Sequence, residues 1–416
     1  MIWIFLFTSL FMIWLEYKID ERLINVVSVI TIPYVVVILV NNLYAVKADF
    51  YEISNQTIAM EMLGLFSIFL GTVIVNHRRK ILIGRTEKVY TTNEKFQYYN
   101  MNAMKIYCIL IELLCYIRLV YFVRRHGFAY LSRDGVENFI SGPIGHAYFS
   151  IYVLIPILFF YWIKNKKSIS YLVTALAGTA LSFFSFTKYH VIGLMILTYL
   201  FIALEDYHYI KKGALVLIGL VIAIFVANYV IGFINAKVIH SVNRNFYLNH
   251  LWKYVGGSII HSNTIFQNGQ NLHADFIEKI LFCTLPLLNM LLKFIAGVEI
   301  QFPDIYIPYE RVGANYLGET SNVVDFIGFM YPSKQGVAAI IFFAIIMCLF
   351  GMIAALLYNR AMRQENSFYI TICVFFTFFL ALAFFGEFAS KSMTWELLVW
   401  SFILPKLFDR RIIIKI

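Results

Sequence analysis

The chain has 416 residues, of which 61% are hydrophobic and only 14% are charged, and its mean hydropathy is +0.74. Soluble domains carry charge on about a quarter of their residues, so this composition excludes a soluble globular protein and indicates an integral membrane protein. Repeated apolar runs of about 20 residues predict helices rather than the short alternating strands of a barrel. The net charge is +10. In a membrane protein, the loops in which the positive residues lie matter more than the total charge, so this value does not indicate a nucleic-acid partner.

Eleven apolar runs predict helical spans. No Lys or Arg precedes the first run, unlike in a secretory signal, so the N-terminus is expected outside. In chain order, the expected spans cover residues 1–15, 23–40, 56–75, 103–123, 146–163, 169–186, 191–204, 213–234, 336–358, 368–389 and 394–408. We therefore predict an all-α, polytopic helical integral membrane protein with about eleven transmembrane helices, forming a single domain over residues 1–416.

The positive charges assign the loops to the two sides of the membrane. Lys and Arg are enriched in cytoplasmic loops. Basic groups at 78–80, 164–167, 211–212, 360–363 and 410–415 all fall on one side of the eleven-span topology. The pattern predicts an outer N-terminus and a cytoplasmic C-terminus.

The longest segment between expected spans is 235–335, on the outer side between the eighth and ninth spans. Within it, residues 280–300 are long enough to cross the membrane, but a crossing there would place the last basic loop and the basic tail outside. Pro286, Asn289 and Lys293 also interrupt this run. We expect a large outer loop in which 280–300 forms an interfacial or re-entrant helix.

Positive residues on the outer side are unexpected and therefore informative. Outer loops are normally poor in Lys and Arg, and guanidinium groups bind phosphate oxygens through two parallel hydrogen bonds. A cationic outer site for an anionic ligand is predicted, with the candidates Arg124, Arg125, Arg133, Lys188, Arg244, Lys253, Arg311 and Lys334.

Histidines and acids on the same side supply candidate bases. A neutral imidazole can accept a proton from a hydroxyl near neutral pH. Seven histidines fall outside: His126, His146, His190, His240, His250, His261 and His273. The outer acids are Asp134, Asp304, Glu319, Asp325 and Glu387, and Glu61, Glu112 and Arg118 are ionisable groups at membrane depth. No HxH or HExxH spacing is present, so no metal site is predicted.

Together these features resemble the Wzy-type O-antigen and capsular polysaccharide polymerases. The resemblance covers most of the chain and includes ten or more spans with one large outer segment between late spans. A short outer hairpin ends in the positive residue Lys188. Trp252–Ser258 resembles a Y-x-x-G-S-like segment, and Gly318–Asn322, followed by an aromatic run and Gly336, resembles the T-N approach to the next span. Arg124 to Gly135 has the Arg-to-Gly spacing of some members, which Arg311 does not reproduce.

The resemblance implies polymerisation of undecaprenyl-pyrophosphate-linked oligosaccharide repeat units at the periplasmic face of a bacterial inner membrane. The arginines and lysines, with Asn322, would bind pyrophosphate and glycan, and His261, Asp325 or His250 would be the base. No cofactor or metal would be needed. Besides the bilayer and the lipid-linked substrate, a chain-length regulator protein is a partner left open.

Three alternatives remain at this point. An O-antigen ligase has the same donor and architecture. A metal-dependent lipid-linked glycosyltransferase would use an acidic pair in the first outer loop, where Asp49 and Glu52 lie, but the flanking segment is short. A flippase or exporter of lipid-linked oligosaccharide should contain two related halves, which the sequence lacks.

Overall fold

A computed structural model describes most of the chain. The described residues are 1–83, 92–127, 142–165, 168–184, 188–236, 246–268, 276–298, 307, 309–314, 320–321, 323–332, 336–363, 367–389 and 391–413. Within them only the backbone is described for 78–83, 92–94, 188–189, 224–236, 246–251, 268, 276–277, 282, 287, 290 and 412–413.

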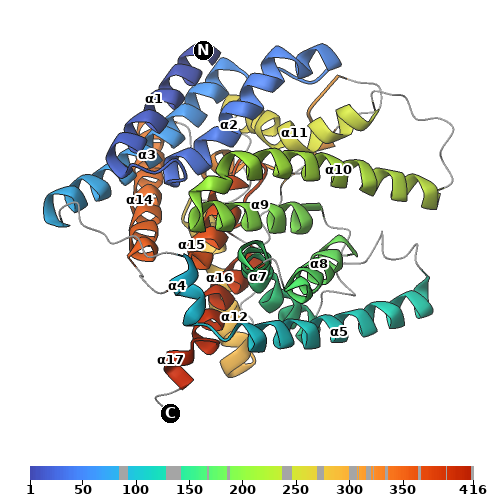
Figure 1. Ribbon diagram of the computed structural model, residues 1–416. Coiled ribbons are helices and arrows are strands. Elements are labelled where there is room, and N and C mark those ends of the chain that lie inside the picture. Colours follow the sequence, from blue (N-terminus) through green and yellow to red (C-terminus); the bar gives the residue numbers. More distant parts are fainter. Residues whose placement is uncertain are drawn as a thin grey trace. The chain divides into compact units, whose positions relative to one another are not determined.

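The described part of the chain is almost entirely helical, as predicted, and a helix overlaps each of the eleven expected spans, although in the tenth it covers only part of the expected length (Figure 1). These helices are α1 (Ile2–Asp20), α2 (Val26–Leu43), α3 (Asn55–Ile83), α5 (Met101–His126), α7 (Gly142–Lys164), α8 (Ile169–Phe184), α9 (Lys188–Glu205), α10 (Ile210–Ala236), α14 (Val337–Met362), α15 (Ile370–Phe375) and α16 (Ser392–Leu407). Among the described residues, six helices are long and apolar enough to cross a membrane: α1, α2, α3, α5, α7 and α14. These apolar helices indicate a membrane-embedded protein.

The tenth expected span is a broken helix. α15 continues as the π-helical segment η3 (Phe376–Ala381), and residues 382–389 then form turns and irregular backbone. Most of this stretch is buried inside the protein. Irregular backbone at membrane depth is tolerated where protein groups satisfy its hydrogen-bonding capacity.

The remaining elements are short or lie in the long segment between the eighth and ninth expected spans. They are η1 (Ala45–Ala48), α4 (Thr92–Gln97), η2 (Tyr207–Tyr209), α11 (Phe246–Asn268), α12 (Phe276–Ala296), β1 (Glu310–Arg311), β2 (Thr320–Ser321), α13 (Phe326–Met330) and α17 (Arg410–Ile413). The expected re-entrant or interfacial helix at 280–300 corresponds to α12. Its C-terminal part exposes Phe294 and Ile295.

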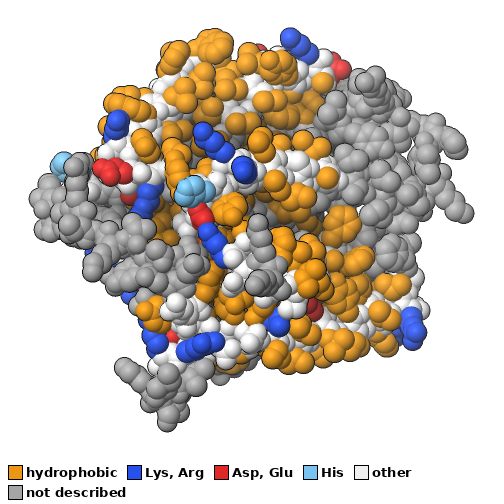
Figure 2. All heavy atoms as spheres, in the orientation of Figure 1, with side chains coloured by type: hydrophobic (Ala, Val, Ile, Leu, Met, Phe, Trp, Pro, Cys, Tyr) orange, Lys and Arg blue, Asp and Glu red, His pale blue; other side chains and the backbone are white. Residues whose placement is uncertain are grey.

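Large apolar side chains are exposed along several helices, as Figure 2 shows on one face of the molecule. On α1, Trp3, Phe7 and Phe11 are exposed, and α5 exposes Leu113 and Ile117. A water-soluble protein would bury such contiguous apolar surface, whereas lipid acyl chains cover it without cost. The surface therefore agrees with the composition.

The chain forms two compact units, each assembled from three separate segments. Unit 1 comprises Met1–Glu87, Asn245–Arg360 and Phe378–Ser392, and unit 2 comprises Lys88–Arg244, Ala361–Thr377 and Met393–Ile416. No break in composition along the sequence marks this division.

In unit 1, α1, α2 and α3 pack together, and α3 also meets α14. Gly71 on α3 faces the backbone of α14, and Gly351 on α14 faces the backbone of α3. A Cβ atom at either glycine would overlap a main-chain carbonyl of the other helix. The two glycines therefore permit the close approach, as small residues do between membrane helices.

Polar contacts in unit 1 join the helix ends that the charge pattern assigns to the cytoplasm, called the predicted inner ends. Asn76 on α3 donates to Glu16 on α1 at 2.7 Å, and Asn359 on α14 donates to Asn76 at 2.8 Å. The Tyr358 hydroxyl lies 3.0 Å from an Asp20 carboxylate oxygen. The C-terminal ends of α1, α3 and α14 thus meet, so these three helices run in the same direction, as the expected topology requires.

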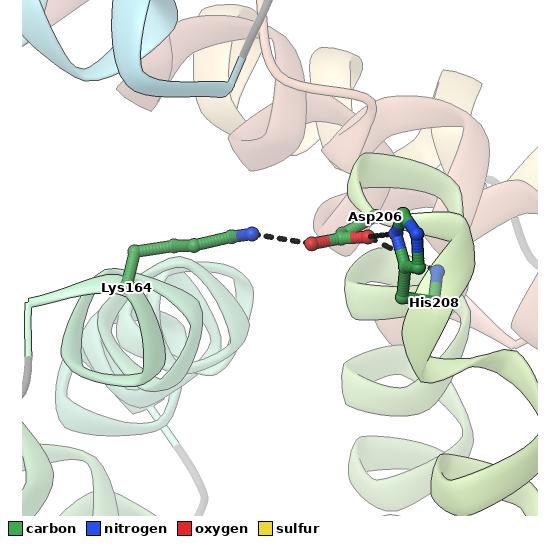
Figure 3. Close-up of polar contacts among 3 residues, drawn as sticks. All are labelled: Lys164, Asp206 and His208. Carbon is green, nitrogen blue, oxygen red and sulfur yellow. Dashed lines mark hydrogen bonds and ion pairs between the residues drawn. The ribbon is translucent and has the colours of Figure 1, made fainter.

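Unit 2 likewise brings together five regions that the charge pattern places inside. Lys95 pairs with Glu205 at 3.1 Å and lies 3.7 Å from the centroid of the Tyr369 ring. Asp206 accepts from Lys164, at the end of α7, and from His208 in η2, as Figure 3 shows. The Arg410 backbone N–H donates to the Tyr98 carbonyl. These contacts agree with a common inner side.

Candidate functional site

The outer segment of unit 1 is organised around α11, whose motif Trp252–Ser258 contains two adjacent glycines with different neighbours. A Cβ atom at Gly256 would overlap the Trp252 indole, and one at Gly257 would lie 3.3 Å from the Ser321 Cβ atom. The Trp252 indole N–H in turn donates to Asn41 on α2 at 2.8 Å. Gly256 therefore allows the Trp252 indole to pack against α11, and Gly257 allows strand β2 to approach the same helix closely.

Strands β1 and β2 form an antiparallel pair, with Arg311 opposite Thr320. The segment after β1 also binds the loop between α2 and α3. The Tyr51 N–H donates to the Val312 carbonyl at 2.9 Å, and the Ala314 N–H donates to the Asp49 carbonyl at 2.8 Å. The two stretches that carry the family resemblance, around Trp252–Ser258 and Thr320–Ser321, thus pack on each other.

Further contacts fasten α11 to the same loop and to the start of α3. The Asn263 side chain accepts from the Ser54 N–H at 3.0 Å and from the Thr57 hydroxyl at 2.7 Å. Its amide donates to the Glu52 carbonyl, and the Gln56 amide donates to the Phe266 carbonyl. We call α11, the β1–β2 pair and the loop 44–54 the outer platform.

Beneath the outer platform lies a buried polar cluster, the Asp325 cluster, made of Tyr34, Glu61, Ser262 and Asp325. Asp325 is the N-cap of α13, and its Oδ1 atom accepts from the N–H groups of Ile327 at 2.9 Å and Gly328 at 3.0 Å. The Tyr34 hydroxyl lies 3.0 Å from the same oxygen, and the Ser262 hydroxyl donates to Oδ2. Burial raises the pKa of the Asp325 carboxyl. The hydrogen bonds that its oxygens accept, above all the one from Ser262, oppose that rise.

The backbone of the broken helix completes this cluster. The Ala383 carbonyl accepts from the Phe326 N–H at 2.8 Å and lies 3.1 Å from the Tyr34 hydroxyl. The Phe384 carbonyl accepts from the Ser258 hydroxyl. These carbonyl groups are free to accept because residues 382–389 are not helical, so the break in the helix and the polar cluster depend on each other.

Glu61, on α3, is the second carboxyl group of the cluster. It is fully buried, and neither carboxyl oxygen has a hydrogen-bond partner among the described residues. Its carboxyl interacts electrostatically with that of Asp325. Glu61 is six residues from the start of α3 and Tyr34 is nine from the end of α2, which at 1.5 Å per residue places them about 9 and 14 Å from those ends.

His261 precedes Ser262 on α11 and is also buried, with 1% of its surface exposed. Within the described residues, neither ring nitrogen has a hydrogen-bond partner. Burial lowers the pKa of His261 to about 4, and the nearby backbone of Val323 opposes this shift. A neutral imidazole is therefore held in an apolar environment beside the Asp325 cluster.

The other predicted site residues fall into three groups. In unit 1, Arg311 is exposed and Lys253 is half-buried on α11, and in unit 2 the exposed Arg124 and Arg125 lie in the last turn of α5. The side chains of Lys188 and His250 are outside the described residues, although both positions are helical. Arg133, Arg244, Asn322 and Lys334 also lie outside the described residues.

In unit 2 the structure pairs two residues that the sequence did not connect. His146 on α7 and Glu396 on α16 lie 2.9 Å apart, from His146 Nδ1 to Glu396 Oε2. The second oxygen of Glu396 accepts from the Trp400 indole N–H at 3.1 Å. The Glu396 side chain is 8% exposed and that of His146 is 62% exposed. A spacing of 250 residues gives no sequence signal for such a pair.

Buried Lys279 on α12 was also not expected. Its ammonium group donates to the Tyr331 carbonyl at 2.6 Å, and Cys283, one turn later, lies 3.6 Å from Glu387. Burial lowers the pKa of Lys279 to about 8. This buried lysine therefore anchors α12 near the C-terminal end of α13.

Comparison of the chain with protein-family models, with curated proteins and with solved structures found no match. The resemblance to the Wzy-type polymerases therefore remains an expectation based on topology and short motifs.

Proposed function

We propose that this protein polymerises undecaprenyl-pyrophosphate-linked oligosaccharide repeat units into O-antigen or capsular polysaccharide at the outer face of a bacterial inner membrane. The observation that carries the proposal is the outer platform. It is a packed assembly fixed to the outer ends of α2 and α3 by main-chain and side-chain hydrogen bonds. An enzyme acting on two lipid-anchored substrates needs such a rigid surface at the membrane boundary, because orientation supplies much of the rate.

Exposed arginines support an anionic, phosphate-containing substrate. Arg311 projects from the outer platform, and Arg124 and Arg125 end α5. A guanidinium group stays charged and offers two parallel donors to phosphate oxygens, which suits a pyrophosphate leaving group whose charge grows as the glycosidic bond breaks. Lys253 on α11 adds a positive charge to the platform.

The proposed reaction is a glycosyl transfer. A hydroxyl oxygen of the acceptor's terminal sugar forms a bond to the anomeric carbon of the donor chain, and the bond from that carbon to the pyrophosphate oxygen breaks. The hydroxyl proton passes to a protein base, and polyprenyl pyrophosphate leaves as an anion. The same chemistry with a lipid A–core acceptor would make the protein a ligase.

A flippase or exporter of lipid-linked oligosaccharide is the second candidate. The broken helix at 370–389 favours it, because transporters commonly place discontinuous helices and buried ionisable groups around a binding site. Glu61 and Asp325 lie beside that break. The outer platform argues against it, since the platform is bound to the helix ends on which alternating access would depend.

The test is the surface polysaccharide of a deletion strain, resolved on a gel. The intact gene should restore a ladder of long chains, and its absence should leave a single repeat unit on lipid A–core. Arg311→Ala and Arg124→Ala should shorten or abolish the ladder at matched expression. Arg410→Ala, an exposed arginine in α17, is the control and should leave the ladder intact.

Other outcomes select the alternatives. Loss of even the single attached unit in the deletion strain excludes a polymerase. Accumulation of polymer on the lipid carrier would then indicate a ligase. Accumulation of single lipid-linked units on the cytoplasmic face would indicate a flippase.

A further inference from the structure

We propose that His146 is the catalytic base of the transfer reaction and that Glu396 is its positioning carboxylate. This inference rests on the proposed function. The juxtaposition of an exposed imidazole with a buried carboxyl group, on helices α7 and α16 of unit 2, carries it.

The hydrogen bond determines which ring nitrogen is available. An ionised carboxylate only accepts hydrogen bonds, so the contact at 2.9 Å requires the proton on Nδ1 of His146. In the neutral ring, Nε2 then carries the lone pair that can accept a proton. A carboxylate that orients a histidine in this way also stabilises the imidazolium formed after proton transfer.

Glu396 is itself held in place. Its Oε1 atom accepts from Trp400, one turn along α16, while Oε2 faces His146. Because both oxygens are engaged and the side chain is buried, the carboxyl group has little freedom to leave the imidazole. A catalytic histidine is expected to have this arrangement, in which one ring nitrogen is available to the substrate and the other is hydrogen-bonded to a fixed carboxylate.

His146 lies at the predicted outer end of unit 2. The Tyr152 hydroxyl donates to the His190 carbonyl, which places Tyr152 level with the first turn of α9. His146 is six residues earlier on α7, so it lies about 9 Å further along the helix in the outward direction. The imidazole is therefore both exposed and on the side where the proposed substrate is found.

Burial separates His146 from the bases expected from sequence. His261 and Asp325 are almost completely buried, and Asp325 accepts hydrogen bonds from two N–H groups and the Ser262 hydroxyl. His146, by contrast, has 62% of its side chain exposed, so an acceptor hydroxyl can reach it more readily than either buried group. In the proposed step, that hydroxyl gives its proton to His146 Nε2 as its oxygen bonds to the anomeric carbon.

The chain provides a matched control in a second histidine–carboxylate pair. His208 is exposed and its Nδ1 atom lies 3.0 Å from Asp206, which also binds Lys164 (Figure 3). This pair lies at the predicted inner end, between α9 and α10. It has similar hydrogen-bond geometry but should not meet the substrate.

The experiment measures polymer formation by purified protein in liposomes from synthetic undecaprenyl-pyrophosphate-linked repeat units. His146→Gln is the decisive variant, because a glutamine amide can still donate to Glu396 and hold α7 to α16 but cannot accept the proton. We expect its rate to fall about 100-fold or more, the usual effect of losing a general base. His208→Gln should retain the wild-type rate.

The pH profile distinguishes catalysis from a structural role. The pH–rate profile of the residual activity of His146→Gln should differ in shape from that of the wild type, because the variant lacks the proposed base. A His146→Gln rate equal to wild type would overturn the assignment of His146 alone. Absence of polymer from wild-type protein, with intact folding, would overturn the proposed function and this inference with it.

Discussion

The buried imidazole of His261 makes a quantitative prediction about stability and pH. Burial lowers the pKa of His261 in the folded protein to about 4, whereas the pKa of an exposed histidine is about 6.5. As pH falls, the unfolded chain therefore binds a proton before the folded protein does. The contribution of His261 to stability is complete above about pH 6.5 and is lost as pH falls toward 4.

The magnitude follows from the two pKa values. Protonation of this one residue lowers the free energy of unfolding at pH 5 by about 2 kcal/mol relative to its value at pH 8. For a chain of this size, that corresponds to a fall in Tm of about 2–4 °C. His261→Gln removes the titrating group while keeping a polar side chain of similar size.

The assay is thermal unfolding in detergent at pH 8, 6 and 5, with wild type and His261→Gln scanned at the same rate. The wild-type Tm should fall more steeply than that of the variant, and the difference between them should change by about 2–4 °C between pH 8 and pH 5. Other titrating residues cancel in this difference. Parallel Tm curves for the two proteins would show that His261 is not held neutral, and would refute the reasoning.

Three further predictions concern packing and buried charge. Gly71→Ala should destabilise the protein by about 3 kcal/mol, because the added Cβ atom would overlap α14. Gly219→Ala on α10 is the control and should not destabilise the protein, because the space around its Cβ position is open. Both effects are measured as Tm values in detergent. Lys95→Met should cost about 3 kcal/mol or more, because the buried Glu205 carboxylate loses its oppositely charged partner, and adding Glu205→Gln should restore much of that loss in the same assay. Asp325→Ala removes a helix cap and the acceptor for four donors, so we expect about 2–4 kcal/mol of destabilisation in chemical unfolding. A denaturation midpoint equal to that of the wild type would contradict the role given to this carboxyl.

The helices were predictable because their apolar runs are long and their loops are marked by charge. The expected span at 56–75, for example, lies within α3, and the basic residues after it end that helix's apolar stretch. The tenth span shows the limit of this reasoning. Residues 368–389 are as apolar as their neighbours, so hydropathy alone cannot reveal that the helix breaks after Ala381.

The candidate site was less predictable, because its residues come from distant parts of the chain. Tyr34 and Ser262 look like ordinary members of their helices, and only the fold brings both to Asp325. Glu61 and Asp325 were each noticeable as carboxyl groups, whereas nothing in the sequence placed the two together. The pairing of His146 with Glu396 likewise depends on how α7 meets α16, which no local pattern encodes.

The broken helix also has a consequence for biosynthesis. The hydroxyl of Tyr34 lies beside the carbonyl of Ala383, 349 residues further along the chain. At a synthesis rate of about 5–20 residues per second, tens of seconds separate the emergence of the two groups from the ribosome. During that interval α2 waits in the bilayer with its tyrosine hydroxyl unmatched by this partner. The contact between α2 and the broken helix can therefore form only near the end of translation, and a chain truncated before residue 378 would leave unit 1 without its last segment.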